Sequence, residues 1–565
     1  MAFHLKRMTA AMLAGCTLLA TAGGPLTAQI IEKPIPGDPV KIDSGLVDGK
    51  ILENGVKAWL GIRYAKPPTN ALRWKAPQPI SWKGVYHADR KGPECIQDLR
   101  PHNINMYFGE EATGEDCLYL NVWAPGNATA SSKLPVIVFI FGGGGTVGSA
   151  GMGLYDGAEA AKRGAIFVNM NYRVGILGFM AHPQLTAESP NHTSGNYAYL
   201  DQNAALKWVH NNIAKFGGDP SKVIIMGQSA GARSVVQQTF SPLSRGLFRG
   251  AVMSSGCNWG TPGTPLADGE KIGLEIQKRV GAANIAEMRD VPADRLLALQ
   301  ANTALGNTST PGIKVGDVID GYFMPKSPMA ILAAHGNSDV PIIASFNHDE
   351  ASNEFKTAKT VAQYKAVAEK VYGAKAAEFL RLYPVKTDAD VWRVGGQMAR
   401  EAGLETNARK CATLQAQYDK SPAYIDVYSR VHPYTPGVKI ADQNTATIGA
   451  YHNADTAYWF GTQDSFNTFR SERKWTAWDR TLSEKMTASL IAFANTGNPS
   501  IPGLNWPAWS AKNEQLVEFG DRINVLKMNT EGMDFLAANT PAAAKAAGGA
   551  LSATPRPGIP GQPRD

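Results

Sequence analysis

Residues 223 to 235 constrain the fold of this chain more than any other stretch. The apolar run Val223–Met226 leads into Gly-Gln-Ser-Ala-Gly at residues 227–231, and small, helix-tolerant residues follow. This pattern predicts a buried strand, a sharp turn and a helix, with Ser229 in strained backbone at the end of the strand. Glycine is needed at Gly227 and Gly231 because side chains there would collide. The Ser229 hydroxyl would then stand exposed beside the positive end of a helix.

The pentapeptide alone supports a nucleophile only weakly. The chain has 57 glycines in 565 residues, so chance supplies Gly-x-Ser-x-Gly on the order of a few tenths of a time. A serine hydroxyl also needs a base to take its proton, and that base needs a third group to orient it. The interpretation of Ser229 therefore depends on partners elsewhere in the chain.

Composition indicates a globular protein. The sequence is 44% hydrophobic and 19% charged, which excludes a mainly disordered or fibrous chain. The 56 Lys and Arg exceed the 49 Asp and Glu by seven, giving a net charge of +7. These charges are spread along the chain, and we expect no nucleic-acid partner because no block of basic residues is present.

The two ends of the chain differ from the rest in composition. Residues 1–28 predict a secretory signal peptide, with Lys6 and Arg7 before an apolar run and a small-residue cleavage site before Gln29. In an alternative interpretation, residues 13–16 form a lipobox and Cys16 is lipidated. No other run is long and apolar enough to predict a membrane span. The Ala-, Pro- and Gly-rich residues 541–565 predict a disordered tail.

Apolar strands alternate with helices through the middle of the chain. Residues 134–141 form a fully apolar run, typical of a central strand, and residues 165–171 predict another. A helix is predicted at 200–215, and further strands at 340–346 and 423–430. Helices are predicted over 360–418 and 485–496. This order is typical of an α/β fold around a parallel sheet.

The order of residues limits the choice of base and acid. In this strand-turn-helix context the acid and then the histidine follow the serine. Only His432 and His452 lie beyond the acidic residues that follow the strand at 340–346, and we favour His452 because its glycine-rich, polar surroundings indicate a loop. The acid is Glu350 or Asp349, which both follow that strand directly and are equivalent on physical grounds.

Glycines and cysteines supply two further expectations. Residues 142–145 are all glycine and follow the apolar run, so backbone N–H groups there could approach a substrate. Gly143 and Gly144, with Ala230 after the serine, would form an oxyanion hole. Among the cysteines we expect Cys95 and Cys117 to close a short disulfide loop. Cys257 and Cys411 could form a second bridge or remain free thiols.

Several motifs together resemble one family. They are Glu-Asp-Cys-Leu-Tyr-Leu-Asn at 115–121, Asn-Tyr-Arg-Val-Gly at 171–175, Phe-Gly-Gly-Asp-Pro at 216–220, the serine motif at 227–231 and Ala-Asn-Thr-Gly-Asn-Pro at 494–499. The sequence resembles the type-B carboxylesterases and cholinesterases from about Gly45 to Trp509. The resemblance implies a single α/β-hydrolase domain over 29–540. Its large mixed, mostly parallel sheet would be flanked by helices, with long loop and helical insertions forming a gorge.

The resemblance also implies roles for individual residues. Ser229 would be the nucleophile, His452 the general base and then acid, and Glu350 the orienting carboxylate. It repeats the oxyanion hole and the Cys95–Cys117 bridge, and it makes Ser255 a hydrogen-bond donor to the acid. No metal or cofactor is implied.

The sequence departs from the family pattern at three positions near the serine. Phe141 stands where many members have His or Tyr, and Gly145 replaces a bulky residue, which predicts a wider acyl pocket. Gln228 replaces a frequent Glu and removes a charge. Tyr107 and Trp259 resemble residues that line the gorge and the acyl pocket.

The function expected from these motifs is serine carboxylesterase activity on a small-molecule ester, outside the cytoplasm. Two alternatives remain: hydrolysis of an amide or carbamate by the same residues, and a non-catalytic binding protein on the same scaffold. Nothing in the sequence identifies the ester or the oligomeric state.

Overall fold

The computed structural model describes residues 33–98, 112–301, 312–440 and 444–540. The predicted signal peptide, the lipobox with Cys16, the predicted tail and Tyr107 lie outside these ranges. No helix in the described ranges is both long and apolar enough to cross a membrane.

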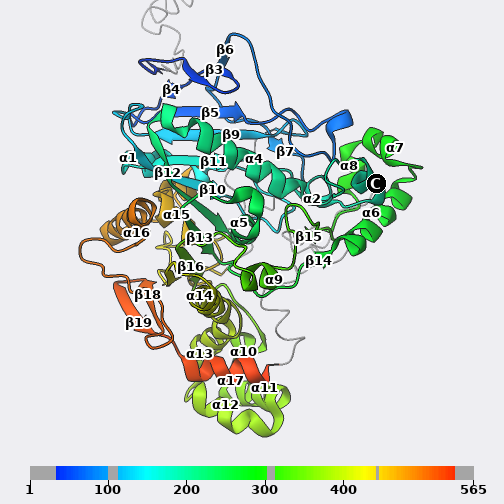
Figure 1. Ribbon diagram of the computed structural model, residues 1–565. Helices are drawn as coiled ribbons and strands as arrows, with labels where there is room; N and C mark the ends of the chain where they lie inside the picture. Colours follow the sequence, from blue (N-terminus) through cyan, green and yellow to red (C-terminus); the bar gives the residue numbers. More distant parts are fainter. Residues whose placement is uncertain (1–32, 99–111, 302–311, 441–443, 541–565) are drawn as a thin grey trace, which may run out of the picture.

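A single large sheet organises the molecule (Figure 1). Its twelve strands, in spatial order, are β1 (Lys33–Pro34), β4 (Lys50–Ile51), β5 (Lys57–Arg63), β9 (Tyr119–Ala124), β11 (Ile166–Met170), β10 (Leu134–Ile140), β12 (Gly218–Gln228), β13 (Gly250–Ser254), β16 (Ile342–Asn347), β17 (Ala423–Tyr428), β18 (Gln515–Phe519) and β19 (Ile523–Lys527).

The seven strands from β11 to β18 run parallel, and the strands outside them are antiparallel. Ile225 of β12 pairs with Val138 of β10 and with Ala251 of β13, and all three side chains are fully buried. Strands covered on both faces consist of apolar residues throughout rather than alternating ones. The predicted mixed, mostly parallel sheet is therefore confirmed.

Helices cover both faces of this sheet (Figure 1). Helix α5 (Ala230–Phe240) packs on β12 and β13 beside α4 (Tyr197–Asn212), and α14 (Thr406–Tyr418) packs on β16 and β17. Helix α16 (Ala477–Thr496) packs on β10 and β12 with α15 (Thr456–Phe460). It begins eight residues before the predicted start at residue 485, because Thr476 and Asp479 cap its N-terminus reciprocally.

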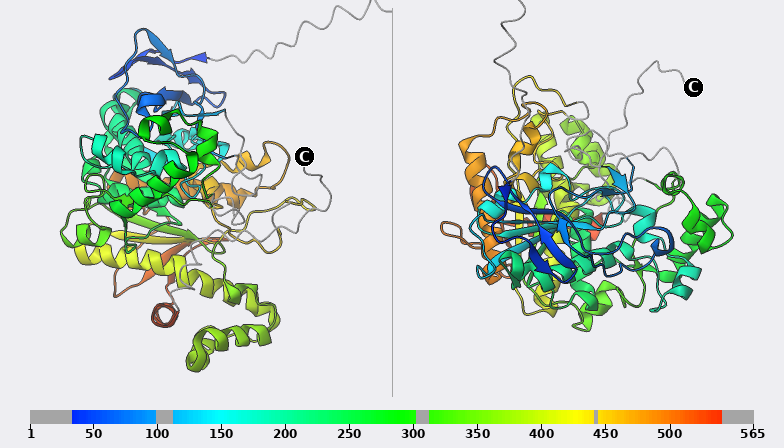
Figure 2. Two further views of the ribbon diagram at one scale, coloured as in Figure 1. Left: turned by 90° about the vertical axis from the view of Figure 1, so that its right-hand side faces the viewer. Right: turned by 90° about the horizontal axis from the view of Figure 1, so that it is seen from above.

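Two groups of helices lie apart from the helices that cover the sheet, one beside α2 (Gly175–Phe179) and the other below α14 in Figure 1 (Figures 1 and 2). The first contains α6 (Leu266–Val280), α7 (Ile285–Asp290) and α8 (Ala293–Leu297). The second contains α10 (Glu354–Thr357), α11 (Val361–Tyr372), α12 (Ala376–Leu382), α13 (Asp388–Arg400) and α17 (Thr530–Asn539). The first group shares a small hydrophobic core with α2, α3 (Pro183–Glu188) and the start of α4, and half of the buried residues in the core of the second are aromatic. The helices α6 to α8 and α10 to α13 are insertions between strands of the sheet, whereas α17 follows the last strand.

The remaining elements are short. They are the strands β2 (Val40–Ile42), β3 (Gly45–Asp48), β6 (Val85–His87), β7 (Glu94–Cys95), β8 (Thr113–Gly114), β14 (Thr264–Pro265) and β15 (Val318–Ile319), and the helices α1 (Ala158–Lys162), α2 (Gly175–Phe179), α3 (Pro183–Glu188) and α9 (Pro328–Ala333).

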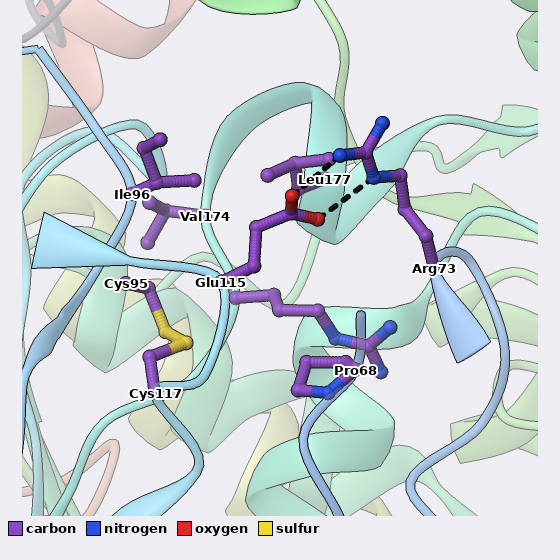
Figure 3. Close-up of a pocket in the computed structure, with 9 residues that line it drawn as sticks. Pro68, Arg73, Cys95, Ile96, Glu115, Cys117, Val174 and Leu177 are labelled. Atoms are coloured by element: carbon purple, nitrogen blue, oxygen red, sulfur yellow. Dashed lines mark hydrogen bonds and ion pairs between the residues drawn. A yellow bond between two sulfur atoms is a disulfide. The ribbon is translucent and has the colours of Figure 1, made fainter. Parts of the chain in front are cut away.

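The Glu-Asp-Cys sequence at 115–117 has a structural role. Glu115 forms a two-point ion pair with Arg73, and Asp116 pairs with Arg63 at 2.5 Å. Cys117 forms the predicted disulfide with Cys95. Figure 3 shows this disulfide and the Arg73–Glu115 pair around a cavity of about 10 Å³, which holds roughly one water. The three residues thus fix the loop to the scaffold.

The second pair of cysteines is also joined. Cys257, shortly after β13, forms a disulfide with Cys411 of α14. From the sequence, a second disulfide and two free buried thiols were equally reasonable for these cysteines. The bridge attaches the segment after β13 to a helix on the face of the sheet.

Candidate active site

Ser229 occupies the predicted turn between β12 and α5. Its backbone has φ 57° and ψ −122°, a strained conformation for a residue other than glycine. A Cβ added at Gly227 would lie 2.2 Å from the carbonyl oxygen of Gly231, and one at Gly231 would lie 2.0 Å from that of Ile140. Both glycines are therefore sterically required.

His452 and Glu350 meet at the same edge of the sheet. Glu350 follows β16 and is 1% exposed as a side chain, and its Oε2 is hydrogen-bonded to Nδ1 of His452. The other oxygen, Oε1, accepts hydrogen bonds from the Ser255 hydroxyl at 2.9 Å and from the Asn347 N–H at 2.8 Å. This carboxylate is held by three donors, and Ser255 lies where the resemblance puts it.

Asp349, the alternative acid, has a different partner. Its Oδ2 accepts a hydrogen bond from the Ala450 N–H at 2.8 Å, and its own N–H donates to the Ala450 carbonyl at 3.0 Å. A Cβ at Gly449 would lie 2.2 Å from Oδ2, and Gly449 has φ +64°. Asp349 therefore holds the turn that leads to His452, whereas Glu350 contacts the histidine itself.

The protonation of His452 depends on Glu350. Burial lowers the pKa of His452, but the hydrogen bond and the negative charge of Glu350 raise it more, so the pKa lies above its ordinary value. With Nδ1–H directed at the carboxylate, Nε2 carries the lone pair of the neutral ring. The side-chain amide of Gln228 lies 3.1 Å from this Nε2 and donates to it. Gln228 thus contacts the base directly, a contact that its sequence position did not reveal.

His432, the alternative base, is a core residue. It is 2% exposed and lies among aromatic rings, with Nε2 3.0 Å from the Ala454 carbonyl oxygen. Burial and the nearby Arg473 lower the pKa of His432 to about 3. Its other ring nitrogen, Nδ1, lies 3.2 Å from the Tyr451 hydroxyl, so both nitrogens have partners in the core. The assignment of the base to His452 stays the prediction.

The buried His432 predicts a specific dependence of stability on pH. The unfolded chain binds a proton on this residue below pH 6.5, whereas the folded chain does so only near pH 3. Stability from the neutral ring is therefore fully present above pH 6.5 and is lost as the pH falls toward 3, by at most about 1.4 kcal/mol per pH unit. Urea unfolding at pH 4.5, 5.5 and 7.5 measures it. We expect a shallower pH dependence for His432→Gln, and an unchanged one for the exposed His87→Gln; equal slopes in all three proteins would contradict the prediction.

The four glycines after β10 pack against the serine. A Cβ at Gly142 would lie 3.0 Å from Cβ of Ser229, and one at Gly143 would lie 2.0 Å from the Val147 carbonyl oxygen. Gly143 and Gly144 have φ of +112° and +65°. Among the described residues, no backbone carbonyl accepts a hydrogen bond from the N–H of Gly143 or Gly144. Both N–H groups, one or two residues after the glycine that packs against Ser229, therefore lack a backbone acceptor in the described part of the chain. The oxyanion role of Gly143, Gly144 and Ala230 stays a prediction.

The structure shows what surrounds three residues that the sequence places near the serine or its pocket. A Cβ at Gly145 would lie 3.4 Å from Nη2 of Arg233 and 3.5 Å from Cε2 of Phe179, and Gly145 has φ +78°. A larger residue there would be strained and would point at these two side chains, which leaves the prediction of a wider acyl pocket open. Trp259 is 2% exposed and packs edge-on against Phe240. Phe141 stacks on Tyr172.

A second buried carboxylate lies behind the histidine and was missed by the sequence analysis. Asp455 is fully buried three residues after His452, and burial raises its pKa. Its oxygens accept hydrogen bonds from Ser254, Asn347 and Trp459. These bonds tie the histidine loop to the ends of β13 and β16. The one sequence signal that could have pointed to Asp455 is its position three residues after His452.

Comparisons with known proteins agree with this architecture. The sequence model described as the carboxylesterase family matches residues 37–536. The fumonisin B1 esterase of Sphingopyxis macrogoltabida is 32% identical over 522 residues, covering 91% of this chain and 92% of that protein. The para-nitrobenzyl esterase of Bacillus subtilis (strain 168) is 30% identical over 481 residues, covering 84% and 93%.

Solved structures share the fold. A PNB esterase structure matches with a TM-score of 0.70 and 28% identity, covering 89% of this chain and 99% of that one. A thermophilic PNB esterase matches with a TM-score of 0.69 and 29% identity, covering 89% and 100%. These similarities confirm the α/β-hydrolase fold predicted from the motifs.

Proposed function

The chain belongs to the carboxylesterase family and is a carboxylic ester hydrolase, and we propose that it acts through Ser229, His452 and Glu350 with a covalent acyl-enzyme intermediate. The observation that carries this proposal is the Glu350–His452 hydrogen bond at the sheet edge where β12 ends in Ser229. A carboxylate on Nδ1 leaves Nε2 as the base, which is the tautomer that activation of a serine needs.

In the first half-reaction, Ser229 Oγ attacks the ester carbonyl and its proton passes to Nε2 of His452. The carbonyl oxygen becomes an oxyanion, which the N–H groups of Gly143, Gly144 and Ala230 stabilise by donation. Each such donor contributes about 2.7–4 kcal/mol to transition-state stabilisation. The C–O bond to the alcohol then breaks, and the alcohol leaves with the proton from His452. In the second half-reaction water gives a proton to Nε2 of His452 and attacks the acyl carbonyl. The bond between the acyl carbon and Ser229 Oγ then breaks, and Oγ takes the proton back from His452 as the acid leaves.

Gln228 has a positioning role in this scheme. Its amide donates to Nε2 of His452, and the Ser229 hydroxyl must take that place when it donates its proton. A neutral amide keeps the ring oriented without adding a second negative charge, so Glu350 remains the carboxylate that stabilises the imidazolium. The sequence alone indicated only the loss of a charge at this position.

The proposed setting is outside the cytoplasm. The two disulfides, Cys95–Cys117 and Cys257–Cys411, are consistent with an exported protein. We assign residues 1–28 to a signal peptide, with lipidation at Cys16 as the alternative. Hydrolysis of an amide or a carbamate by the same residues remains the second chemical possibility, since its first step is the same.

Covalent labelling tests the nucleophile. A fluorophosphonate probe should label the wild-type protein once, and Ser229→Ala should abolish both labelling and hydrolysis of phenyl acetate. Ser255→Ala is the matched control, because its hydroxyl contacts Glu350 and leaves Ser229 in place. Intact-protein mass spectrometry reads the adduct. Labelling that persists in Ser229→Ala, or a wild-type protein that takes no label, would reject the proposed nucleophile.

A further inference from the structure

Arg233 is an exposed arginine in an otherwise buried turn of α5. Its neighbours Ala232 and Ser234 are 0% and 3% exposed, whereas Arg233 is open to solvent. It lies one helical turn after the serine, and its N–H donates to the Ser229 carbonyl at 3.1 Å. A guanidinium remains protonated at every physiological pH. The nucleophile therefore has a permanent cation one turn away.

This side chain lines a cavity of about 220 Å³ between α5, α9, β14 and β15 (Figure 1). Gln237 and Asp317 supply polar groups to the wall, and Val318 and Met324 supply apolar ones. Gly256 also lines the cavity, and a Cβ there would lie 2.5 Å from the Ser229 carbonyl oxygen. The cavity thus adjoins the backbone of the proposed nucleophile.

The guanidinium also reaches the glycine loop. A Cβ at Gly145 would lie 3.4 Å from Nη2 of Arg233, and Gly145 directly follows Gly143 and Gly144. Because Gly145 has no side chain, the space between the Arg233 guanidinium and the glycine loop stays open.

Arg233 is the cation of this cavity, and none of the ion pairs among the described residues involves it. Asp317 accepts a hydrogen bond from Gln237 at 2.9 Å and acts on Arg233 only through its charge, whereas the Tyr199 side chain contacts the guanidinium. The cavity therefore contains a guanidinium that is not ion-paired with the one carboxylate of the wall.

We propose that Arg233 binds a carboxylate on the acyl group of the substrate, so that the preferred esters are monoesters of short dicarboxylic acids. The inference rests on the proposed function, since it places the reacting carbonyl at Ser229. A guanidinium binds a carboxylate through two parallel N–H donors, which fixes the orientation of the acyl chain. The leaving alcohol extends away from this cavity.

Three related esters test the proposal, and the first two release the same alcohol, benzyl alcohol. Monobenzyl succinate carries the carboxylate, benzyl succinamate replaces it with a neutral amide of the same shape, and 4-(acetoxymethyl)benzoate carries a carboxylate on the alcohol instead. We expect kcat/KM to be about ten- to a hundredfold higher for monobenzyl succinate than for benzyl succinamate. Arg233→Gln should remove this preference, and Arg233→Lys should retain part of it. Arg279→Gln, which removes an exposed charge from α6, should leave the ratio unchanged.

Binding provides a readout that does not require turnover. In the Ser229→Ala background, calorimetry should show tighter binding of monobenzyl succinate than of benzyl succinamate, and adding Arg233→Gln should equalise the two. Equal binding and equal kcat/KM in the parent protein, or a preference only for the carboxylate on the alcohol, would overturn the inference while Ser229-dependent hydrolysis of benzyl acetate leaves the proposed function standing. Failure of that hydrolysis would count against the proposed function instead.

Discussion

Replacement of His452 by alanine is expected to lower kcat by about 10⁶-fold, because the Ser229 hydroxyl then has no base. The side chain of His452 is 18% exposed and lies in a loop, so the fold should survive the change. Steady-state hydrolysis of phenyl acetate, with thermal unfolding of each variant, separates lost chemistry from lost structure. We expect KM to change much less than kcat, since the ring does not bind the leaving alcohol.

A rescue experiment and a control variant make the test of His452 more specific. Free imidazole should restore part of the activity of His452→Ala, because it can enter the space left by the ring and act as a base. The matched control is His87→Ala, an exposed histidine far from the site in sequence, which should retain full activity. Activity of His452→Ala within tenfold of the wild type would assign the base elsewhere.

Replacement of Glu350 by glutamine should lower kcat by about 10³- to 10⁴-fold while the fold is kept. Glutamine preserves the shape but removes the negative charge that stabilises the imidazolium. The pKa of His452 should fall, since Glu350 raises it. The acidic limb of the kcat/KM profile should therefore move to lower pH, because His452 must be neutral to act as a base. A pH–rate profile of Glu350→Gln and the wild type measures both effects.

Asp349→Asn is the matched control for Glu350→Gln. Its side chain supports Ala450 rather than His452, so the change should lower the unfolding midpoint and reduce kcat by less than about tenfold. The acidic limb should keep its position. If Asp349→Asn lost more activity than Glu350→Gln, the two carboxylates would have exchanged roles.

The sequence predicted the sheet because its signals are local. The strands at 134–140, 223–228 and 342–347 are apolar runs bounded by glycine or polar residues, and their neighbours are fixed by the rules for parallel sheets. The signal for the additional turns at the start of α16 is also local, because Thr476 and Asp479 cap the N-terminus of this helix. The arrangement of the two helical insertions was not predictable, because their cores consist of contacts between helices rather than of a single periodic pattern.

The candidate site also contains residues that local sequence signals predicted and contacts that they could not predict. Chain order and turn geometry predicted Ser229 and His452 as nucleophile and base, and the family resemblance favoured Glu350 over Asp349 as the acid. The contact of Gln228 with His452 joins residues 224 positions apart, and no local pattern encodes such a pair. Arg233 was visible as a cation four residues after the serine, but its exposure inside a cavity depends on segments near residues 256 and 317.

The Cys95–Cys117 bridge has a consequence for the order in which parts of the sheet would loosen. Its two Cα atoms lie 4.8 Å apart, so the two described ends of the intervening sequence are held at nearly one point. The pairs of Glu115 with Arg73 and of Asp116 with Arg63 anchor the end next to Cys117. Cys117 lies two residues before β9, so the bridge and the two ion pairs fix the start of this strand. Opening the bridge should therefore loosen the start of β9 before it disturbs Ser229, which follows a strand further inside the sheet.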